Sequence, residues 1–293
     1  MHLDTARKPL TMSFAAVLFS AIVAWVGAAS AESGSTAQGD EIYKPSVGQE
    51  GKDVIWVPTA DELVTAMLKT AKVTPDDIVY DLGAGDGKIA IAAARDFGAT
   101  AVGIEYNADM AALAQRNAER AGVANKVKII NGDIFEEDFS NATVVTLYLL
   151  PHLNMKLRPI LLDMKPGTRI VSNSFDMESW QPDEYINTEF RNGYFWIVPA
   201  KVSGNWSLGG FPGKGTVDLN LSQKFQVVEG TAKINGKAQP LLEPKLSGDN
   251  FSFTLIDANG NQQRLELKVA GDRMAGRATN ATGSLDVSAA RVN

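Results

Sequence analysis

The sequence predicts an α/β sheet domain followed by a small antiparallel β domain, either a barrel or a sandwich. From Val54 to about Ala200, short apolar runs alternate with helical patterns, as in a parallel sheet whose strands are joined by helices. After Ala200, apolar and polar residues alternate singly, which is typical of half-buried antiparallel strands. The length of 293 residues is sufficient for two domains. We therefore expect an α/β domain at residues 54–201 and a β-rich domain at residues 202–293.

The α/β domain is expected to contain five strands. Apolar runs place them at Ile78–Leu82, Ala101–Glu105, Val127–Ile130, Val144–Leu149 and Arg169–Ser172. Helical patterns cover Lys88–Asp96, a stretch from about Asp109 that Gly122 ends, and Leu153–Met164 despite its internal proline. A further helix begins near Thr59, which we expect to cap it with Glu62 as the capping-box partner.

The β-rich domain is identified by its alternation and its turns. Alternating apolar positions occur at Val217, Leu219 and Leu221, at Phe251, Phe253 and Leu255, at Leu265, Leu267 and Val269, and at Leu285 and Val287. Asn235-Gly236, Asn259-Gly260 and Gly271-Asp272 lie between such runs and favour hairpin turns. The pattern contains no internal sequence repeat.

Composition excludes several classes of function. Apolar residues make up 45% and charged residues 21%, as in soluble globular proteins. The net charge of −6 gives no electrostatic reason to expect a nucleic-acid partner. The absence of cysteine excludes disulfides and thiolate chemistry, and two histidines are too few for a histidine metal site. No metal is expected, although a site made only of carboxylates stays open without any motif for it.

Residues 1–31 are typical of a targeting segment. Arg7 and Lys8 precede an apolar run, and Ala29-Ser30-Ala31 offers the small residues of a signal-peptidase site. The alternative is an uncleaved membrane anchor, although the strongly apolar run is shorter than the ~20 residues that span a bilayer. Either interpretation predicts export to the periplasm or cell envelope, with membrane association in the second. Residues 32–53 are rich in polar residues and glycine, and are expected to form a flexible lead-in.

The motif most informative about function is the loop Asp81-Leu82-Gly83-Ala84-Gly85-Asp86-Gly87 after the first expected strand. A dinucleotide fingerprint would require a third glycine at the position of Lys88. Asp86 would also repel a phosphate held by backbone N–H groups. The loop therefore favours a nucleoside ligand without phosphates. It disfavours a nicotinamide-dependent oxidoreductase, which is the weakest of the alternatives.

S-adenosylmethionine is such a ligand. Asp81 can bind its ammonium by a charge-assisted hydrogen bond, and Gly83 and Gly85 allow its amino-acid portion to approach the backbone. Glu105, at the end of the second strand, can accept the ribose hydroxyls. The remaining contact, to the adenine, falls to Asp133 and the backbone of Ile134. Any one of these acidic residues could be only a cap or a turn residue, but together they end successive strands, where α/β sheets bind ligands.

The segment from about residue 55 to residue 182 resembles a family of small lysine N-methyltransferases that modify the mitochondrial ATP synthase c-subunit and adenine nucleotide translocase. They resemble the Dot1-type histone methyltransferases more loosely. The shared features are, in chain order, Val57-Pro58-Thr59, Tyr80–Ile89, Gly103–Asn107, Tyr148-Leu149-Leu150-Pro151, Gly167–Val171, Phe175 and Trp180-Gln181-Pro182. The resemblance implies a class I methyltransferase with a Rossmann-like sheet and S-adenosylmethionine as cofactor. The β-rich domain lies outside it.

The resemblance also implies roles for individual residues. Asp81, Gly83, Gly85, Glu105 and Asp133 would bind the cofactor, and Pro58 and Thr59 would line the site. Tyr148–Pro151 would face the methyl acceptor, with Tyr148 as the candidate catalytic residue, although it could equally be a core aromatic. A protein lysine side chain is the expected acceptor, with a small-molecule acceptor left open.

Export conflicts with the cofactor, because S-adenosylmethionine is made in the cytosol. A second hypothesis is therefore an exported binding or scaffold protein whose methyltransferase domain has degenerated and whose β domain carries the function.

Overall fold

The computed structural model describes residues 39–189, 191–213 and 216–292. The segment 1–31, expected to be a signal peptide or an anchor, lies outside the described residues. Within the described ranges, no helix combines the length and apolar character needed to cross a membrane.

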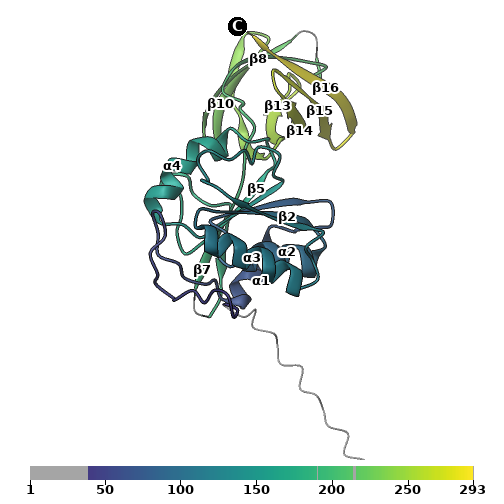
Figure 1. Ribbon diagram of the computed structural model, residues 1–293. Helices are drawn as coiled ribbons and strands as arrows, with labels where there is room; N and C mark the ends of the chain where they lie inside the picture. Colours follow the sequence, from purple (N-terminus) through teal and green to yellow (C-terminus); the bar gives the residue numbers. More distant parts are fainter. Residues whose placement is uncertain (1–38, 190, 214–215, 293) are drawn as a thin grey trace, which may run out of the picture. The chain divides into compact units, whose positions relative to one another are not determined.

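The first domain is built on a seven-stranded sheet with the strand order β3-β2-β1-β4-β5-β7-β6 (Figure 1). Its strands are β1 (Ile78–Leu82), β2 (Thr100–Glu105), β3 (Val127–Asn131), β4 (Val144–Leu147), β5 (Arg169–Asn173), β6 (Glu184–Asn187) and β7 (Asn192–Ile197). Strands β1 to β5 pair in parallel, whereas β7 pairs antiparallel with both β5 and β6. The strand order changes direction between β1 and β4, and α/β sheets bind ligands at such a point.

Helices cover both faces of this sheet. They are α1 (Asp61–Thr70), α2 (Lys88–Phe97), α3 (Ala108–Arg120) and α4 (Pro151–Leu162). Helices α1, α2 and α3 lie together on one face (Figure 1) and share one apolar cluster, in which α2 contributes its alanines. The other face is covered by α4, whose Leu153, Leu157 and Leu161 pack with Trp180 and Trp196.

The five predicted strands and the helices between them are confirmed within a few residues. Two expectations about local structure are wrong. Helix α1 has Ala60 at its N-cap and no side-chain cap, and the Thr59 hydroxyl instead accepts a hydrogen bond from Asn173 Nδ2 at 3.2 Å. Strand β4 ends at Leu147, because Tyr148 and Leu149 leave the sheet on the way to α4. The antiparallel strands β6 and β7 were not predicted.

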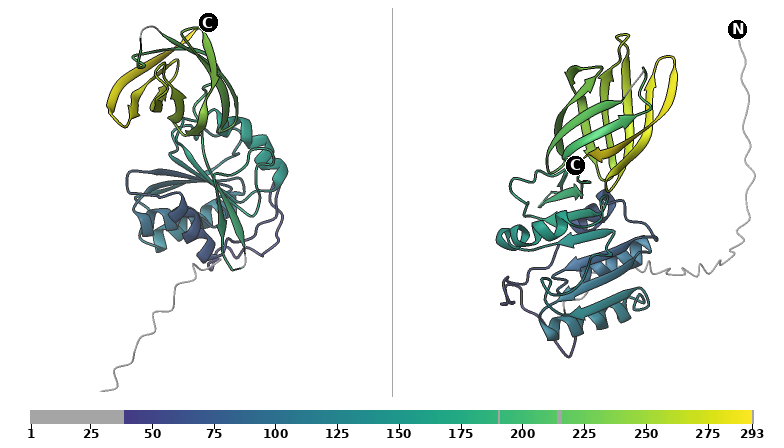
Figure 2. Two further views of the ribbon diagram at one scale, coloured as in Figure 1. Left: turned by 180° about the vertical axis from the view of Figure 1, so that it is seen from behind. Right: turned by 90° about the horizontal axis from the view of Figure 1, so that it is seen from above.

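The second domain is a single nine-stranded antiparallel sheet with the order β11-β10-β9-β8-β16-β15-β14-β13-β12. Its strands are those coloured green to yellow in Figure 2. Its strands are β8 (Gly204–Gly209), β9 (Val217–Lys224), β10 (Val227–Ile234), β11 (Lys237–Pro240), β12 (Leu242–Ser247), β13 (Asn250–Ile256), β14 (Gln262–Ala270), β15 (Arg273–Asn280) and β16 (Gly283–Val292). Strand β10 also lies beside β12, so the sheet nearly closes on itself. Of the two predicted forms, the domain is therefore barrel-like.

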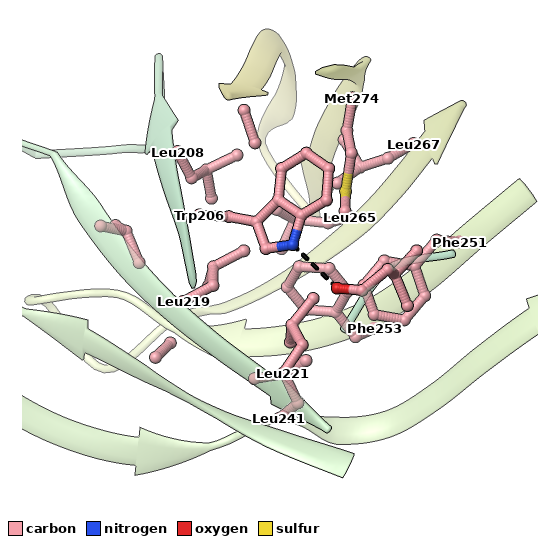
Figure 3. Packing of buried hydrophobic residues seen from close by; sticks show 14 of the residues in the cluster. Trp206, Leu208, Leu219, Leu221, Leu241, Phe251, Phe253, Leu265, Leu267 and Met274 are labelled. Carbon is pink, nitrogen blue, oxygen red and sulfur yellow. Dashed lines mark hydrogen bonds between the residues drawn. The ribbon is translucent and has the colours of Figure 1, made fainter. Parts of the chain in front are cut away.

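Large apolar side chains fill the interior of this barrel-like domain (Figure 3). Trp206, Phe251 and Phe253 are at most 1% exposed. The Trp206 indole donates a hydrogen bond of 2.8 Å to the carbonyl oxygen of Val202, which satisfies its polar atom within the core. Leu285 departs from the predicted alternation, because it is 51% exposed.

The turn between β9 and β10 contacts the first domain. Phe225 stacks on Trp180 with ring centres 6.0 Å apart. The Trp180 indole donates a hydrogen bond of 3.0 Å to Gln226 Oε1, and Gln226 Nε2 donates one of 2.8 Å to the Gln181 carbonyl oxygen. These contacts join the two sheets through residues of the Trp-Gln-Pro segment.

Candidate functional site

A cavity of about 260 Å³ lies at the carboxyl ends of the parallel strands. Nearly all of the residues that the sequence singles out line it, namely Pro58, Thr59, Asp81, Gly83, Gly85, Glu105, Asp133, Ile134, Tyr148, Leu149 and Leu150. Pro151 does not, because it is already the first residue of α4. Strands β1, β2 and β4 bring Asp81, Glu105 and Tyr148 to this edge because parallel strands end on the same side of a sheet. The expected common cleft is therefore present.

The glycine loop closes one wall of the cavity, and most of its backbone donors are already engaged. The N–H groups of Gly83 and Ala84 both donate to the Ile104 carbonyl oxygen at 2.9 Å. Gly85 N–H donates to Glu105 Oε2 at 2.8 Å, and Gly87 N–H donates to the Ala84 carbonyl oxygen. A phosphate would need such N–H groups free, so this geometry agrees with a phosphate-free ligand.

Asp81 is a buried carboxyl group at the end of β1. It is 2% exposed, and its Oδ1 accepts a hydrogen bond of 2.6 Å from the Thr146 hydroxyl on β4. Burial raises the pKa of Asp81 to about 7, against the opposing effect of that hydrogen bond and with further raising by Asp86 and Glu105. A buried acid of this kind is stabilised by a cation placed against it.

Asp86, in the middle of the loop, has a carboxylate oxygen without a partner. Its Oδ2 is buried and makes no hydrogen bond within the described part of the chain. Burial raises the pKa of Asp86. Asn117 Nδ2 donates a hydrogen bond of 2.8 Å to the Asp86 backbone oxygen, which ties the loop to α3. An orphan acidic oxygen beside the cavity favours a cationic ligand there.

Glu105 has a structural task besides the expected ribose contact. Its two carboxylate oxygens accept hydrogen bonds from the N–H groups of Gly85 at 2.8 Å and Asn107 at 2.9 Å. Burial raises the pKa of Glu105, while these backbone hydrogen bonds act in the opposite direction. Each oxygen keeps a second lone pair, so a diol can still bind.

Asp133 is paired with a residue from the lead-in. Lys52 Nζ lies 2.5 Å from Asp133 Oδ2, and Phe135 N–H donates to Asp133 Oδ1 at 3.0 Å. The Lys52 hydrogen bond is the main reason that the pKa of Asp133 is lowered. Lys52 also lies 4.8 Å from the centre of the Tyr106 ring. The sequence identified Asp133 but not Lys52.

The lead-in itself forms one wall of the cavity. Residues 49–56 form a hairpin, in which Gly48 N–H donates to the Trp56 carbonyl oxygen and Trp56 N–H to the Gln49 carbonyl oxygen. Residues from Gln49 to Thr59 all line the cavity. The polar composition of residues 32–53 concealed this role, and the only signal was the position of Trp56 immediately before the Val-Pro-Thr segment.

Further polar contacts fix Thr59. Its hydroxyl accepts a hydrogen bond from Asn173 at the end of β5, and its backbone oxygen accepts one of 3.0 Å from Lys88 Nζ. Lys88 also pairs with Asp61 Oδ1 at 2.9 Å. These bonds hold the start of α1 against the glycine loop.

The end of the cavity near β4 is apolar and aromatic. Tyr148, Leu149, Leu150 and Phe175 line it. Arg191, on an exposed turn, donates a hydrogen bond of 3.1 Å to the Tyr148 hydroxyl. Tyr148 therefore faces the cavity rather than the core.

The charge of the lining suits a cation. Six carboxyl groups and two amines line the cavity: Glu50, Asp53, Asp81, Asp86, Glu105 and Asp133, with Lys52 and Lys88. S-adenosylmethionine carries an ammonium and a sulfonium against one carboxylate, so its net charge complements this lining. A group of acidic or histidine residues placed to hold a metal is not found among the described residues.

A larger hollow of about 510 Å³ lies near β6 and β7 but lacks these features. Two of its charged groups are already engaged: Arg169 pairs with Asp77, and Asp183 accepts a hydrogen bond of 2.7 Å from Ile197 N–H. We therefore assign the functional site to the smaller cavity.

Comparison with known proteins agrees with this assignment. Residues 81–184 match the family described as the ANTKMT methyltransferase domain. A protein-lysine N-methyltransferase of Saccharolobus islandicus is 48% identical over 141 residues, which cover 47% of this chain and 88% of that protein. The adenine nucleotide translocase lysine N-methyltransferase of Mus musculus is 31% identical over 130 residues, which cover 44% of this chain and 56% of that protein.

Two solved structures are similar to part of this chain. An RNA methyltransferase from Salinibacter ruber, crystallised with S-adenosylhomocysteine, is 50% identical to this chain. The match covers 50% of this chain and 96% of the Salinibacter chain, with a TM-score of 0.49. An S-adenosylmethionine-dependent methyltransferase from Geobacter sulfurreducens, also crystallised with S-adenosylhomocysteine, is 26% identical and covers 39% of this chain and 48% of that chain, with a TM-score of 0.36.

Proposed function

Because this chain belongs to the protein-lysine N-methyltransferase family of S-adenosylmethionine-dependent enzymes, we propose that it methylates lysine side chains of a protein substrate. The enzyme class and the cofactor follow from the family. The acceptor is the part that is proposed. The choice of a lysine amine as acceptor is supported by one observation: the cavity is acidic at one end and apolar and aromatic at the other.

That end of the cavity suits the acceptor amine. A lysine ammonium, with an unperturbed pKa of about 10.4, loses its proton at a cost of roughly 4–5 kcal/mol at pH 7. An apolar wall formed by Leu149 and Leu150 disfavours the charged form of the amine and lowers this cost. Arg191 can only donate, so the Tyr148 oxygen keeps a lone pair that can accept an N–H of the neutral amine and orient it.

The cofactor supplies an electrophilic methyl group, and the residues of the chain mainly bind, align and exclude water. Asp81 would hold the cationic end of the cofactor, and Glu105 and Asp133 would hold its adenosyl end. Tyr148 and Phe175 would border the acceptor amine, whose nitrogen takes the methyl group while the bond from that group to sulfur breaks and S-adenosylhomocysteine leaves.

The other hypotheses receive less support. The family names give no support to a degenerate scaffold protein, and the engaged N–H groups of the glycine loop disfavour a dinucleotide. Action in the cell envelope stays a proposal, motivated by the sequence of residues 1–31. Methylation of a small molecule is the alternative that the experiment must separate.

The test is to incubate the full chain with S-adenosylmethionine and cell-envelope or total protein, and then to identify products by mass spectrometry. We expect increments of 14 Da on lysine residues, absent when Asp81→Ala replaces the wild-type chain. The Tyr185→Phe variant is the matched control, because Tyr185 is exposed and does not line the cavity.

Methylated small molecules in the absence of any modified lysine would contradict the proposed acceptor. Cofactor binding measured on the same preparation separates a wrong acceptor from a chain that does not bind cofactor.

A further inference from the structure

The hairpin that covers the cavity places a tryptophan against the glycine loop. Trp56 lies immediately before the Val-Pro-Thr segment and lines the cavity. Its indole is so close to Gly85 that a Cβ atom at that glycine would lie 2.7 Å from Trp56 Nε1. The backbone bonds of the hairpin to Gly48 and Gln49 fix this position.

At its methionyl end the cofactor has an ammonium, a sulfonium and a carboxylate. The carboxylate is the group for which the cavity offers no evident partner. The ammonium and the sulfonium are cations, and the acidic lining provides carboxyl groups for them. The carboxylate needs a hydrogen-bond donor instead. In a lining with six carboxyl groups, a free donor near the glycine loop is therefore the missing element of recognition.

Most donors near Gly85 are bound to other groups. The N–H groups of Gly83, Ala84, Gly85 and Gly87 bond to protein oxygens. Lys88 Nζ is held by the Thr59 carbonyl oxygen and by Asp61. The indole N–H of Trp56 is different, because no hydrogen bond among the described residues uses it although it lies at the cavity wall.

We propose that the Trp56 indole N–H binds the carboxylate of the cofactor's methionyl group. An indole nitrogen is a donor only, so it distinguishes a carboxylate from the ammonium beside it. Its ring covers Gly85 at the same time and excludes water from the methionyl end. The proposal depends on the cofactor but not on the identity of the methyl acceptor, so the two can fail separately.

The experiment compares two ligands that differ by one group, S-adenosylmethionine and decarboxylated S-adenosylmethionine. Isothermal titration of the full chain and of the Trp56→Phe variant gives the four affinities. We expect Trp56→Phe to weaken S-adenosylmethionine by about 10- to 100-fold, the effect of losing a hydrogen bond to a charged group. Its affinity for the decarboxylated ligand should change by less than about threefold. Tyr185→Phe should change neither affinity.

An equal loss for both ligands would mean that Trp56 acts by packing alone, and would overturn the proposal. Unchanged affinity for both would also overturn it, with the third N–H of Lys88 as the next donor to test. If the variant does not fold, the wild-type chain still decides the matter by nuclear magnetic resonance. The indole N–H resonance of Trp56 should move downfield with S-adenosylmethionine but not with the decarboxylated ligand.

Discussion

Lys52 Nζ lies 2.5 Å from Asp133 Oδ2, and this ion pair joins the hairpin before α1 to the loop after β3. The two residues are 81 positions apart in the chain. Both line the cavity, Lys52 at the tip of the hairpin and Asp133 at the end expected to hold adenine. The pair therefore fastens the hairpin across that end of the site.

Replacing Lys52 with methionine should loosen this closure. The side chain of Lys52 is 39% exposed, so salt screens its attraction to Asp133 and the effect on global stability is small. We expect cofactor to dissociate about two- to tenfold faster at low salt, with a smaller difference at high salt. Stopped-flow fluorescence measures both rates. Lys201→Met is the matched control, because Lys201 pairs with Asp163 away from the cavity. Equal dissociation rates for the two variants would contradict the role of Lys52.

Replacing Asp81 with asparagine should stabilise the cofactor-free protein at alkaline pH. The pKa of Asp81 rises from an ordinary 3.8 to about 7 on folding, so folding favours its protonated form. This contribution is fully present below about pH 4 and is lost as the pH rises through 7. Asp81→Asn should therefore raise the free energy of unfolding by on the order of 1–4 kcal/mol at pH 8, with little change at pH 4.

The same variant should bind S-adenosylmethionine more weakly, by roughly 1.5–3 kcal/mol, because a neutral amide replaces the carboxylate that faces the ammonium. Binding to the wild-type chain should also strengthen between pH 6 and 8, as Asp81 ionises. Thermal melts and titrations at several pH values check both halves. Glu105→Ala should weaken binding by a similar amount. A stability difference that does not depend on pH would contradict the assignment for Asp81.

Replacing Gly85 with alanine tests the contact with Trp56. Gly85 has a φ of +57°, which already disfavours a side chain, and its added Cβ would meet the indole. Gly236→Ala is the matched control, with a φ of +83° and no atom within 4 Å of the added Cβ. Both variants should lose about 1 kcal/mol of stability from backbone strain, and Gly85→Ala should lose more because the indole must shift. Gly85→Ala alone should lower cofactor affinity, by at least tenfold in titration. Similar affinities in the two variants would show that the indole does not constrain this position.

Replacing Gln226 with alanine should destabilise the protein through Trp180. The buried Trp180 indole would lose its acceptor, which costs about 1–3 kcal/mol. Denaturant unfolding followed by tryptophan fluorescence measures this loss. Gln262→Ala, at an exposed position on β14, should change stability by less than about 0.5 kcal/mol. Equal stability of the two variants would show that the contact between the β9–β10 turn and Trp180 contributes little.

Replacing Tyr148 with phenylalanine should separate the acceptor from the cofactor. The ring stays in place while the hydroxyl that accepts from Arg191 is lost. We expect kcat for lysine methylation to fall about 10-fold, the effect of losing one hydrogen bond that orients the amine, with an unchanged Kd for S-adenosylmethionine. A weakened Kd with normal kcat would instead place Tyr148 in the cofactor site.

The sequence predicted the parallel part of the fold because local chemistry determines it. Strand β1 ends in a carboxylate and a glycine turn, and this order specifies a strand, a tight loop and a helix start. Asp81, Glu105 and Asp133 could be placed together because parallel strands end at one edge. Their position at one cavity could therefore be predicted without knowing how the side chains pack.

Features that depend on distant partners could not be predicted. Thr59 has the sequence of a helix cap, but Asn173, 114 residues later, donates a hydrogen bond to it instead. Lys52 lies in a segment with the composition of a linker, and only its ion pair with Asp133 in the folded chain reveals its role. Strands β6 and β7 are short, and they become strands only by pairing, β7 with β5 and β6 with β7.

The filled interior of the nine-stranded domain limits how it can take part in recognition. Trp206, Phe251 and Phe253 pack together with the other apolar side chains at its centre. Whatever it recognises must touch its outer strands and turns. Such a surface suits a macromolecule better than a metabolite.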